Sequence, residues 1–217
     1  MGKTKLAFLS ICLGASLGSP LSALALDIAL LGGAGPTFAS WTVIPTIPPT
    51  DYRYNKTQIG LSWQASLQVG QDFSFVPVPV LSQFGVVSGA FFSSEVLRDS
   101  SDWAYDSFWL RYLDIPFLLR FSIVRFLSIF AGGYYGIALA QGPHTLQSSG
   151  APLVMYSHFG FMGGISGKLP LTSHLNLVAM AYYQQGFTPA IDNFTSGSLF
   201  AGFRRSVKAQ AGIQLEF

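Results

Sequence analysis

The stretch that decides the fold is Ser206-Val207-Lys208-Ala209-Gln210-Ala211-Gly212-Ile213-Gln214-Leu215-Glu216-Phe217. Every second residue of this stretch is apolar, and the residues between them are polar, charged or glycine. A β-strand points successive side chains to opposite faces, so the pattern predicts a strand with one apolar face and one polar face. A helix would mix the two sets of residues on every side.

The same alternation recurs in earlier segments of the chain. It is clearest over 58–70, and it is looser over 112–120, 126–140 and 174–183. Weaker patterns over 27–36, 78–92 and 153–168 bring the total to eight expected strands. Many of these segments exceed the about 9–11 residues that a tilted strand needs to cross a bilayer.

The connections between these strands alternate in length. The long connections are expected at 37–56, 93–105, 141–152 and 188–203, and the short ones at 71–77, 121–125 and 169–173. Outer-membrane barrels have short turns on the periplasmic side and longer loops outside. The sequence therefore predicts an all-β fold, an eight-stranded antiparallel transmembrane β-barrel with up-and-down meander topology, with both ends of the chain on the periplasmic side.

Composition separates this fold from its competitors. The chain is 50% hydrophobic and only 10% charged, against about 25% charged in an average soluble domain. A disordered chain and a nucleic-acid binder are therefore not expected. A soluble lipocalin-type barrel would show many charges on its polar strand faces. A helical membrane protein would need an apolar run of 18 residues or more, and none is present. Both alternatives stay open at this point.

The first 25 residues are expected to be a secretory signal peptide. Lys3 and Lys5 precede an uncharged, mostly apolar segment, and Ala23-Leu24-Ala25 offers small residues for cleavage after Ala25. Residues 26–217 would then form the outer-membrane β-barrel domain. An uncleaved anchor and a lipid anchor at Cys12 were the alternatives, and the bulky Ile11 disfavours the second. Export of this kind predicts a location in the outer membrane of a diderm bacterium.

Two further segments resemble a known family. Tyr112-Leu113-Asp114-Ile115-Pro116-Phe117-Leu118-Leu119-Arg120 is similar to a strand of the small PorT-like outer-membrane-protein β-barrel domains, and Gly132-Gly133-Tyr134-Tyr135-Gly136 resembles the strand that follows it. The architecture resembles that of OmpX-type and OmpW-type barrels. A terminal strand ending in Phe217 resembles the signal that the barrel-assembly machinery recognises. The resemblance implies an integral outer-membrane protein and no particular activity.

Aromatic residues near the strand ends suggest the belts that flank a membrane. Those residues are Tyr52, Tyr54, Trp103, Tyr105, Trp109, Tyr112 and Tyr156. Charged residues on the polar strand faces should point inward, because charge is expensive in hydrocarbon. This inward polar network comprises Asp114, Arg120, His158, Lys168, Lys208 and Glu216. It would either plug the barrel or line a polar path for small solutes.

The functional expectation is porin-like passive passage of small solutes, hydrophobic ones included. The alternative is a surface-exposed structural or adhesion barrel whose outer loops bind host or envelope partners. No enzyme, cofactor or metal site is expected, because His144, His158 and His174 lack zinc-ligand spacing. His144 with Ser148 is the only catalytic candidate worth naming. The expected partners are outer-membrane lipid and the assembly machinery, and nucleic acid is not one.

Overall fold

The computed structural model describes residues 26–45, 55–73, 83–98, 107–142, 153–195 and 198–217. Nearly all of them lie in ten strands. The strands are β1 (Leu26–Pro45), β2 (Asn55–Asp72), β3 (Phe84–Arg98), β4 (Ser107–Val124), β5 (Leu127–Gly142), β6 (Leu153–Met155), β7 (His158–Pro170), β8 (Leu175–Gly186), β9 (Ile191–Thr195) and β10 (Ser198–Glu216).

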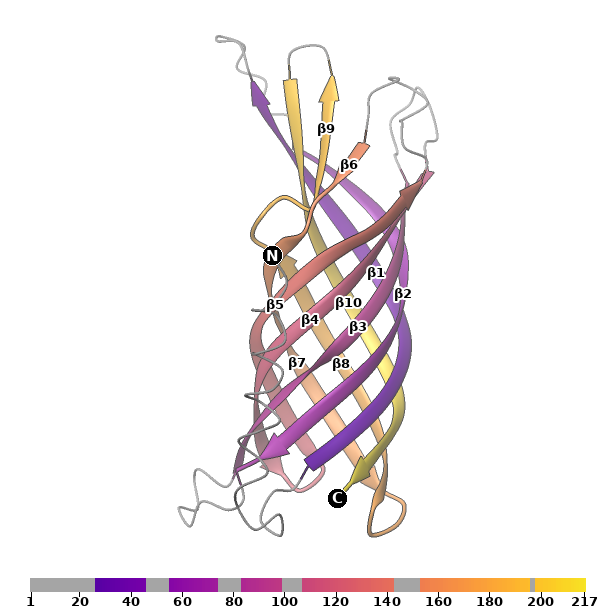
Figure 1. Ribbon diagram of the computed structural model, residues 1–217, viewed down its shortest axis with the longest axis vertical. Coiled ribbons are helices and arrows are strands. Elements are labelled where there is room, and N and C mark those ends of the chain that lie inside the picture. Colours follow the sequence, from indigo (N-terminus) through magenta and orange to yellow (C-terminus); the bar gives the residue numbers. More distant parts are fainter. Residues whose placement is uncertain (1–25, 46–54, 74–82, 99–106, 143–152, 196–197) are drawn as a thin grey trace, which may run out of the picture.

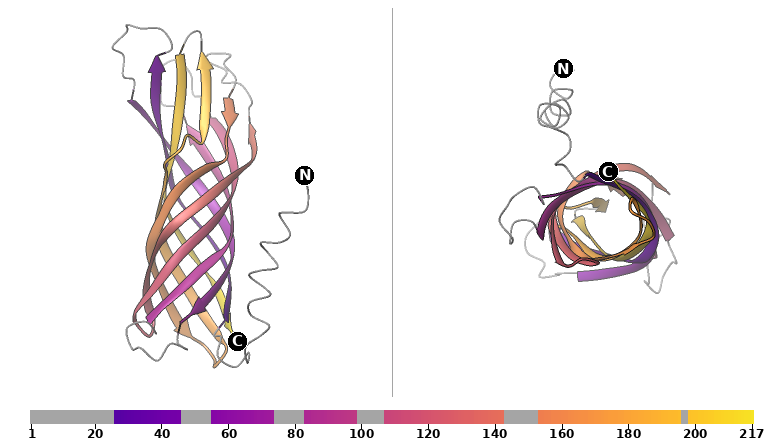
Figure 2. Two further views of the ribbon diagram at one scale, coloured as in Figure 1. Left: turned by 60° about the vertical axis from the view of Figure 1, so that its left-hand side comes forward. Right: turned by 90° about the horizontal axis from the view of Figure 1, so that it is seen from below.

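Eight of these strands form a closed antiparallel barrel. Each pairs with the next in the order β1-β2-β3-β4-β5-β7-β8-β10, and β10 returns to pair with β1 along most of its length. The closed ring is visible end-on in Figure 2. The short strands β6 and β9 extend one end, where β9 pairs with β10 and β6 pairs with β9 (Figure 1). The predicted eight-stranded meander is confirmed.

The two ends of the barrel differ. We call the end that carries β6 and β9 the outer end, and the opposite end, where β1 begins and β10 finishes, the inner end (Figure 1). At the inner end β4 and β5 are joined by a turn at 125–126, and β7 and β8 by residues 171–174. The predicted short connections 121–125 and 169–173 overlap these turns, although residues 121–124 belong to β4 and residues 169–170 to β7.

Several predicted strand boundaries were wrong. The segment 78–92 was expected to be a strand, but β3 begins at Phe84 and runs to Arg98, and residues 78–82 lie outside the described part. The prolines at 77 and 79 cannot donate a ladder hydrogen bond, which favours a later start. The expected long connections 37–56, 93–105 and 188–203 were too long as well, because β1, β3, β9 and β10 occupy part of each. Charged residues also lie within these strands, because the side chains of Glu95 on β3 and Arg204 on β10 point into the barrel.

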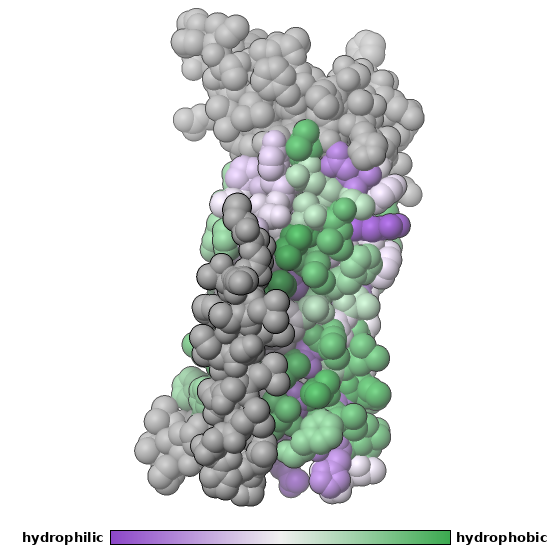
Figure 3. All heavy atoms as spheres, in the orientation of Figure 1, coloured by the Kyte–Doolittle hydropathy of each residue, from purple (hydrophilic) through white to green (hydrophobic). Residues whose placement is uncertain are grey.

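The outward face of the barrel is apolar over a band of limited height. On β10 the outward residues run from Val207 to Phe217, and Arg205 stands above them. Ten residue steps of about 3.3 Å, tilted by about 40°, rise about 25 Å, which is the height of the apolar band on outer-membrane barrels. On β4 the outward residues from Leu113 to Ile123 give the same span, with Arg111 above them. Figure 3 shows apolar side chains over much of the visible barrel wall.

This outward band contradicts the soluble-barrel alternative, which needs the apolar face inside. Leu61 and Phe117, for example, are 66% and 68% exposed. In the described residues no helix is long and apolar enough to cross a membrane. One belt prediction was wrong: Tyr112 is fully buried inside the barrel, because it shares the strand parity of Asp114. Tyr52, Tyr54, Trp103 and Tyr105 lie outside the described residues.

The seam that closes the barrel depends on close backbone approach. A Cβ on Gly33 of β1 would lie 1.8 Å from the backbone oxygen of Ala209 on β10. A Cβ on the neighbouring Gly32 would meet nothing closer than 3.9 Å. A side chain is therefore excluded at Gly33 and tolerated at Gly32.

Candidate functional site: the layered interior

Inward side chains fill the barrel in three layers. Along β4 a charged residue, an apolar residue and a second charged residue follow one another from the outer end: Asp114, Leu118 and Arg120. Along β7 the corresponding residues are His158, Met162 and Lys168. We call these levels the outer charged layer, the apolar layer and the inner polar layer. An eight-stranded barrel is narrow enough for side chains to fill it.

Arg204 of β10 is the centre of the outer charged layer. Its guanidinium bridges two carboxylates, with Nη2 2.6 Å from Glu95 Oε1 and Nη1 2.7 Å from Asp114 Oδ1. It also donates a hydrogen bond of 2.8 Å to the Ser93 hydroxyl. Arg204 is 2% exposed and the two carboxylates 1% or less. A planar guanidinium has five donors in a fixed fork, which suits it to a buried position between two acids.

Lys208 completes the charge balance of this layer. Its ammonium donates to Glu95 Oε1 over 3.0 Å, and the Thr37 hydroxyl donates to the other Glu95 oxygen over 3.0 Å. The Gln184 amide donates to Asp114 Oδ2 over 3.0 Å. Two cations therefore face two carboxylates, and both carboxylates receive several hydrogen bonds. Buried charge is tolerated when it is paired and hydrogen-bonded in this way.

Aromatic rings surround the cluster. The Arg204 guanidinium lies 4.6 Å from the centre of the Tyr112 ring, a cation–π contact. His158 packs edge-on against Tyr112 and Tyr134, at ring-centre distances of 5.0 and 5.5 Å. The Tyr112 hydroxyl donates to the backbone oxygen of Ala190, just before β9, over 3.1 Å. The contact ties the charged layer to the segment that covers it at the outer end.

The apolar layer crosses the barrel below the cluster. Its members include Phe91, Phe130, Met162 and Tyr182, and the Phe91 and Tyr182 rings meet edge-on at 6.2 Å. Phe91 and Met162 have no exposed surface. Several polar groups at this level pair with one another, while the Nε2 atoms of Gln64 and Gln210 have no hydrogen-bond partner among the described residues. Ser66 donates to Gln210 over 3.0 Å, and the Tyr182 hydroxyl donates to Gln64.

The inner polar layer contains two ion-pair groups. Arg120 on β4 contacts Asp27 of β1 and Asp72 of β2, each at 2.7 Å. Lys168 of β7 and Glu216 of β10 form the second group, at 2.5 Å. The side chains of this second group are about one-third exposed, so its contribution to stability is small.

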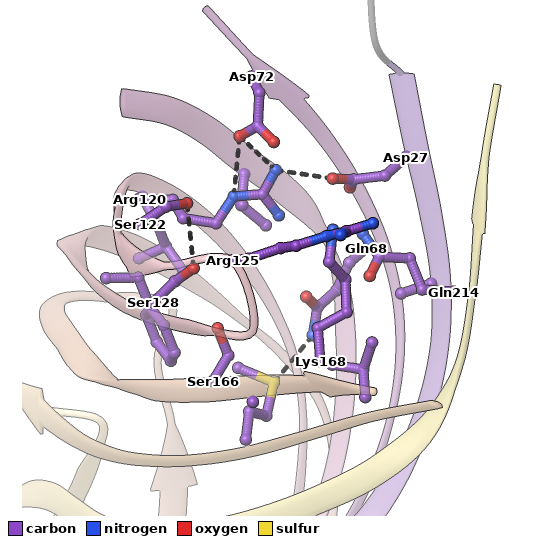
Figure 4. A pocket seen from close by; sticks show the side chains of 17 residues that line it. Asp27, Gln68, Asp72, Arg120, Ser122, Arg125, Ser128, Ser166, Lys168 and Gln214 are labelled. Atoms are coloured by element: carbon purple, nitrogen blue, oxygen red, sulfur yellow. Dashed lines mark hydrogen bonds and ion pairs between the residues drawn. The ribbon is translucent and has the colours of Figure 1, made fainter. Parts of the chain in front are cut away.

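A pocket opens in this inner layer (Figure 4). It has about 60 Å³ of space for water-sized groups. Its charged lining comes from Asp27, Asp72, Arg120, Arg125 and Lys168, and its apolar lining belongs to the layer above. Figure 4 shows the Arg125 side chain extending between Arg120 and Lys168. The pocket stops at the apolar layer and does not continue through the barrel.

The structure divides the six charged residues predicted to point inward. It brings Asp114, His158 and Lys208 together in the outer charged layer, and places Arg120, Lys168 and Glu216 in the inner one. Sequence reasoning missed Glu95, which it assigned to the long connection 93–105, and Arg204, which lies between the expected connection 188–203 and the expected strand 206–217. The signal was present, since Arg204 continues the inward parity of Ser206 and Lys208. Glu95 likewise shares the parity of Phe91.

Catalytic geometry is not evident in the described residues. His144 and Ser148, the candidates named from sequence, lie outside them. His158 is buried among aromatic rings, and His174 is exposed in the turn before β8, where its Nδ1 lies 3.2 Å from the Glu216 backbone oxygen. No group of three metal-ligating side chains occurs among the described residues. Phe217, the expected assembly signal, is 70% exposed at the inner end.

Comparison with known proteins identifies the fold. No family model and no curated protein matches the chain, so membership of the PorT-like family remains a prediction. The Yersinia pestis attachment invasion locus protein Ail, solved with the heparin analogue sucrose octasulfate, aligns with a TM-score of 0.39 at 14% identity, over 88% of this chain and 99% of that one. The Escherichia coli outer-membrane protease OmpT aligns with a TM-score of 0.40 at 8% identity, over 89% of this chain and 97% of that one. The Pseudomonas aeruginosa outer-membrane protein OprG aligns with a TM-score of 0.58 at 13% identity, over 89% of this chain and 96% of that one. The chain therefore has the fold of a small outer-membrane β-barrel.

Proposed function

We propose that this chain is an integral outer-membrane barrel that is closed to solutes and acts through its outer end, as a structural or surface-interaction protein. The apolar band of about 25 Å supports insertion in a bilayer, and the fold shared with OprG supports the outer membrane of a diderm bacterium. Lipid and the barrel-assembly machinery are the partners that such a protein requires.

The outer charged layer is the observation that carries the proposal. Arg204, Glu95, Asp114 and Lys208 are each 2% exposed or less, and they come from three different strands. A solute moving along the barrel axis has to separate these charges and then cross the apolar layer. Separating a buried pair leaves an uncompensated charge, which costs about 3–5 kcal/mol. Such a barrier favours a plug over an open pore.

Porin-like passage is the second candidate. The observation in its favour is the pocket at the inner end, which shows that the interior is not filled at every level. A conducting state would need the apolar layer and the Arg204 cluster to move together. The two candidates therefore differ in whether the purified barrel conducts ions without such a rearrangement.

Planar-bilayer recording separates the two candidates. We expect refolded protein, verified by a heat-modifiable gel shift, to give no conductance steps in salt solution. Liposomes that contain the protein should also swell no faster in small sugars or amino acids than empty liposomes. Regular conductance steps from the correctly folded protein would contradict the closed-barrel proposal and favour passage.

The surface role needs a separate test. The described strand ends that flank residues 46–54, 99–106 and 143–152 lie at the outer end. We expect a variant with these three segments replaced by glycine-serine linkers to assemble normally. Liposomes bearing the intact barrel should bind to host-cell surfaces or to envelope preparations, and the linker variant should not. Equal binding by the two proteins would remove the support for a surface role.

A further inference from the structure

The inner pocket has a cation without a carboxylate partner at its mouth. Arg125 lies in the turn between β4 and β5, and its side chain is exposed. Among the described residues it forms no ion pair, whereas Arg120 and Lys168 are both paired with acids. Within the described part of the chain, the guanidinium of Arg125 is therefore available to an anion from solution.

Neutral hydrogen-bonding groups stand beside this cation. Ser122, Ser128 and Ser166 line the pocket, and so do the amides of Gln68 and Gln214. The hydroxyls of Ser122 and Ser128 lie 3.2 Å apart, so one of them donates to the other and leaves a donor free. Hydroxyls and amides adapt to an oxyanion without adding charge.

The floor of the pocket is apolar. It is formed by Val87, Leu118, Phe130, Val178 and Met180, which belong to the apolar layer. A ligand that fits this pocket has a charged head at the mouth and an apolar tail toward the barrel centre. This division of polar and apolar contacts is typical of sites for small amphiphilic molecules.

We propose that the inner pocket binds a small monocarboxylate with a short apolar chain. The carboxylate pairs with Arg125 and the serine hydroxyls, and the chain packs on Leu118 and Phe130. A water-sized group needs roughly 10–15 Å³ of such space, so the 60 Å³ pocket holds about four to six non-hydrogen atoms. Propionate and butyrate match this size, and medium-chain fatty acids exceed it.

The acids in the pocket lining make the site selective for single negative charges. Asp72 is one-third exposed at the mouth, and Asp27 lies on the other side of the Arg120 guanidinium. The charged lining as a whole holds these two carboxylates and three cations, Arg120, Arg125 and Lys168, so its formal charge is +1. A monoanion neutralises this charge, whereas a dianion such as phosphate leaves an excess of negative charge beside the two carboxylates.

Isothermal titration calorimetry on the full barrel in lipid nanodiscs tests the site. We expect butyrate to bind at one site per barrel, acetate and inorganic phosphate to bind at least about tenfold more weakly, and octanoate to show no one-to-one site. The Arg125→Gln variant should lose about tenfold or more in butyrate affinity, because a charge-assisted hydrogen bond is removed. The substitution lies in an exposed turn, so the barrel should still fold.

Arg111→Gln is the matched control. Arg111 is also an exposed arginine, but it stands on the outward face toward the outer end. Its loss should leave butyrate affinity unchanged. Equal binding of phosphate and butyrate, unchanged affinity in Arg125→Gln, or an equal loss in Arg111→Gln would each overturn the proposal. The absence of butyrate binding to the wild-type protein would do the same.

Discussion

Replacing Arg204 by glutamine tests the outer charged layer directly. In Arg204→Gln two carboxylates, Glu95 and Asp114, keep their burial and lose the cation between them. Contacts of 2.6 Å and 2.7 Å to these acids disappear, as does the hydrogen bond of 2.8 Å to Ser93. Lys208 still neutralises Glu95, so the variant is left with one uncompensated charge near Asp114.

The size of the effect follows from this count. Removing one partner of a buried ion pair costs about 3–5 kcal/mol. With a denaturant slope of about 2–3 kcal/mol per M of urea, we expect the unfolding midpoint of the barrel in lipid vesicles to fall by about 1–2.5 M. Tryptophan fluorescence and the heat-modifiable gel shift follow the transition. Conductance should stay absent, because the apolar layer is unchanged.

The neighbouring residue supplies the control. Arg205 follows Arg204 on the same strand and is exposed on the outward face, so Arg205→Gln should change stability by less than about 0.5 kcal/mol. Adding Asp114→Asn to Arg204→Gln removes the orphaned carboxylate. The double variant should therefore be more stable than Arg204→Gln alone. If Arg204→Gln and Arg205→Gln had equal effects, the assignment of Arg204 to a buried ion cluster would be refuted.

Three further predictions concern the wall and the seam of the barrel. Gly33→Ala should destabilise the closing seam by about 1–3 kcal/mol through overpacking, while Gly32→Ala stays close to wild type in urea unfolding; equal midpoints would contradict the close approach of β1 and β10. Leu177 lies on the outward face and is 44% exposed. Leu177→Arg should destabilise the folded barrel by about 2–4 kcal/mol near the bilayer centre and reduce the fraction of protein that shows the heat-modifiable gel shift. The inward Gln210→Arg should reduce this fraction less. Deletion of Phe217 should lower the amount of barrel assembled in outer-membrane fractions, and normal assembly would remove its role as a signal.

The strand faces were readable from the sequence because alternation is a local property. The outward set Ile59, Leu61 and Trp63 was predicted and is exposed. Strand ends were less readable. In a soluble protein a charged residue often marks the end of a strand, but here Glu95 and Arg204 point into the barrel, so β3 and β10 extend through positions that looked like loops.

Parity also separated outward from inward aromatics better than proximity to a loop did. Tyr112 was placed in a belt because it lies near a strand end. It shares the parity of Asp114 and is buried beside Arg204. The pocket gave no sequence signal of its own, since its lining comes from all eight barrel strands and the turn at 125–126.

The sequence by itself determined that this chain forms an alternating, charge-poor set of strands, and it predicted a barrel with its apolar face outward. Only the tertiary structure decided which charges meet. Glu95 and Arg204 are 109 residues apart, and they come together because closure of the sheet brings β3 and β10 across a narrow lumen. Periodicity fixes the face of a residue, whereas register and closure fix its height and its partner. The outer charged layer, the apolar layer and the inner pocket follow from those heights.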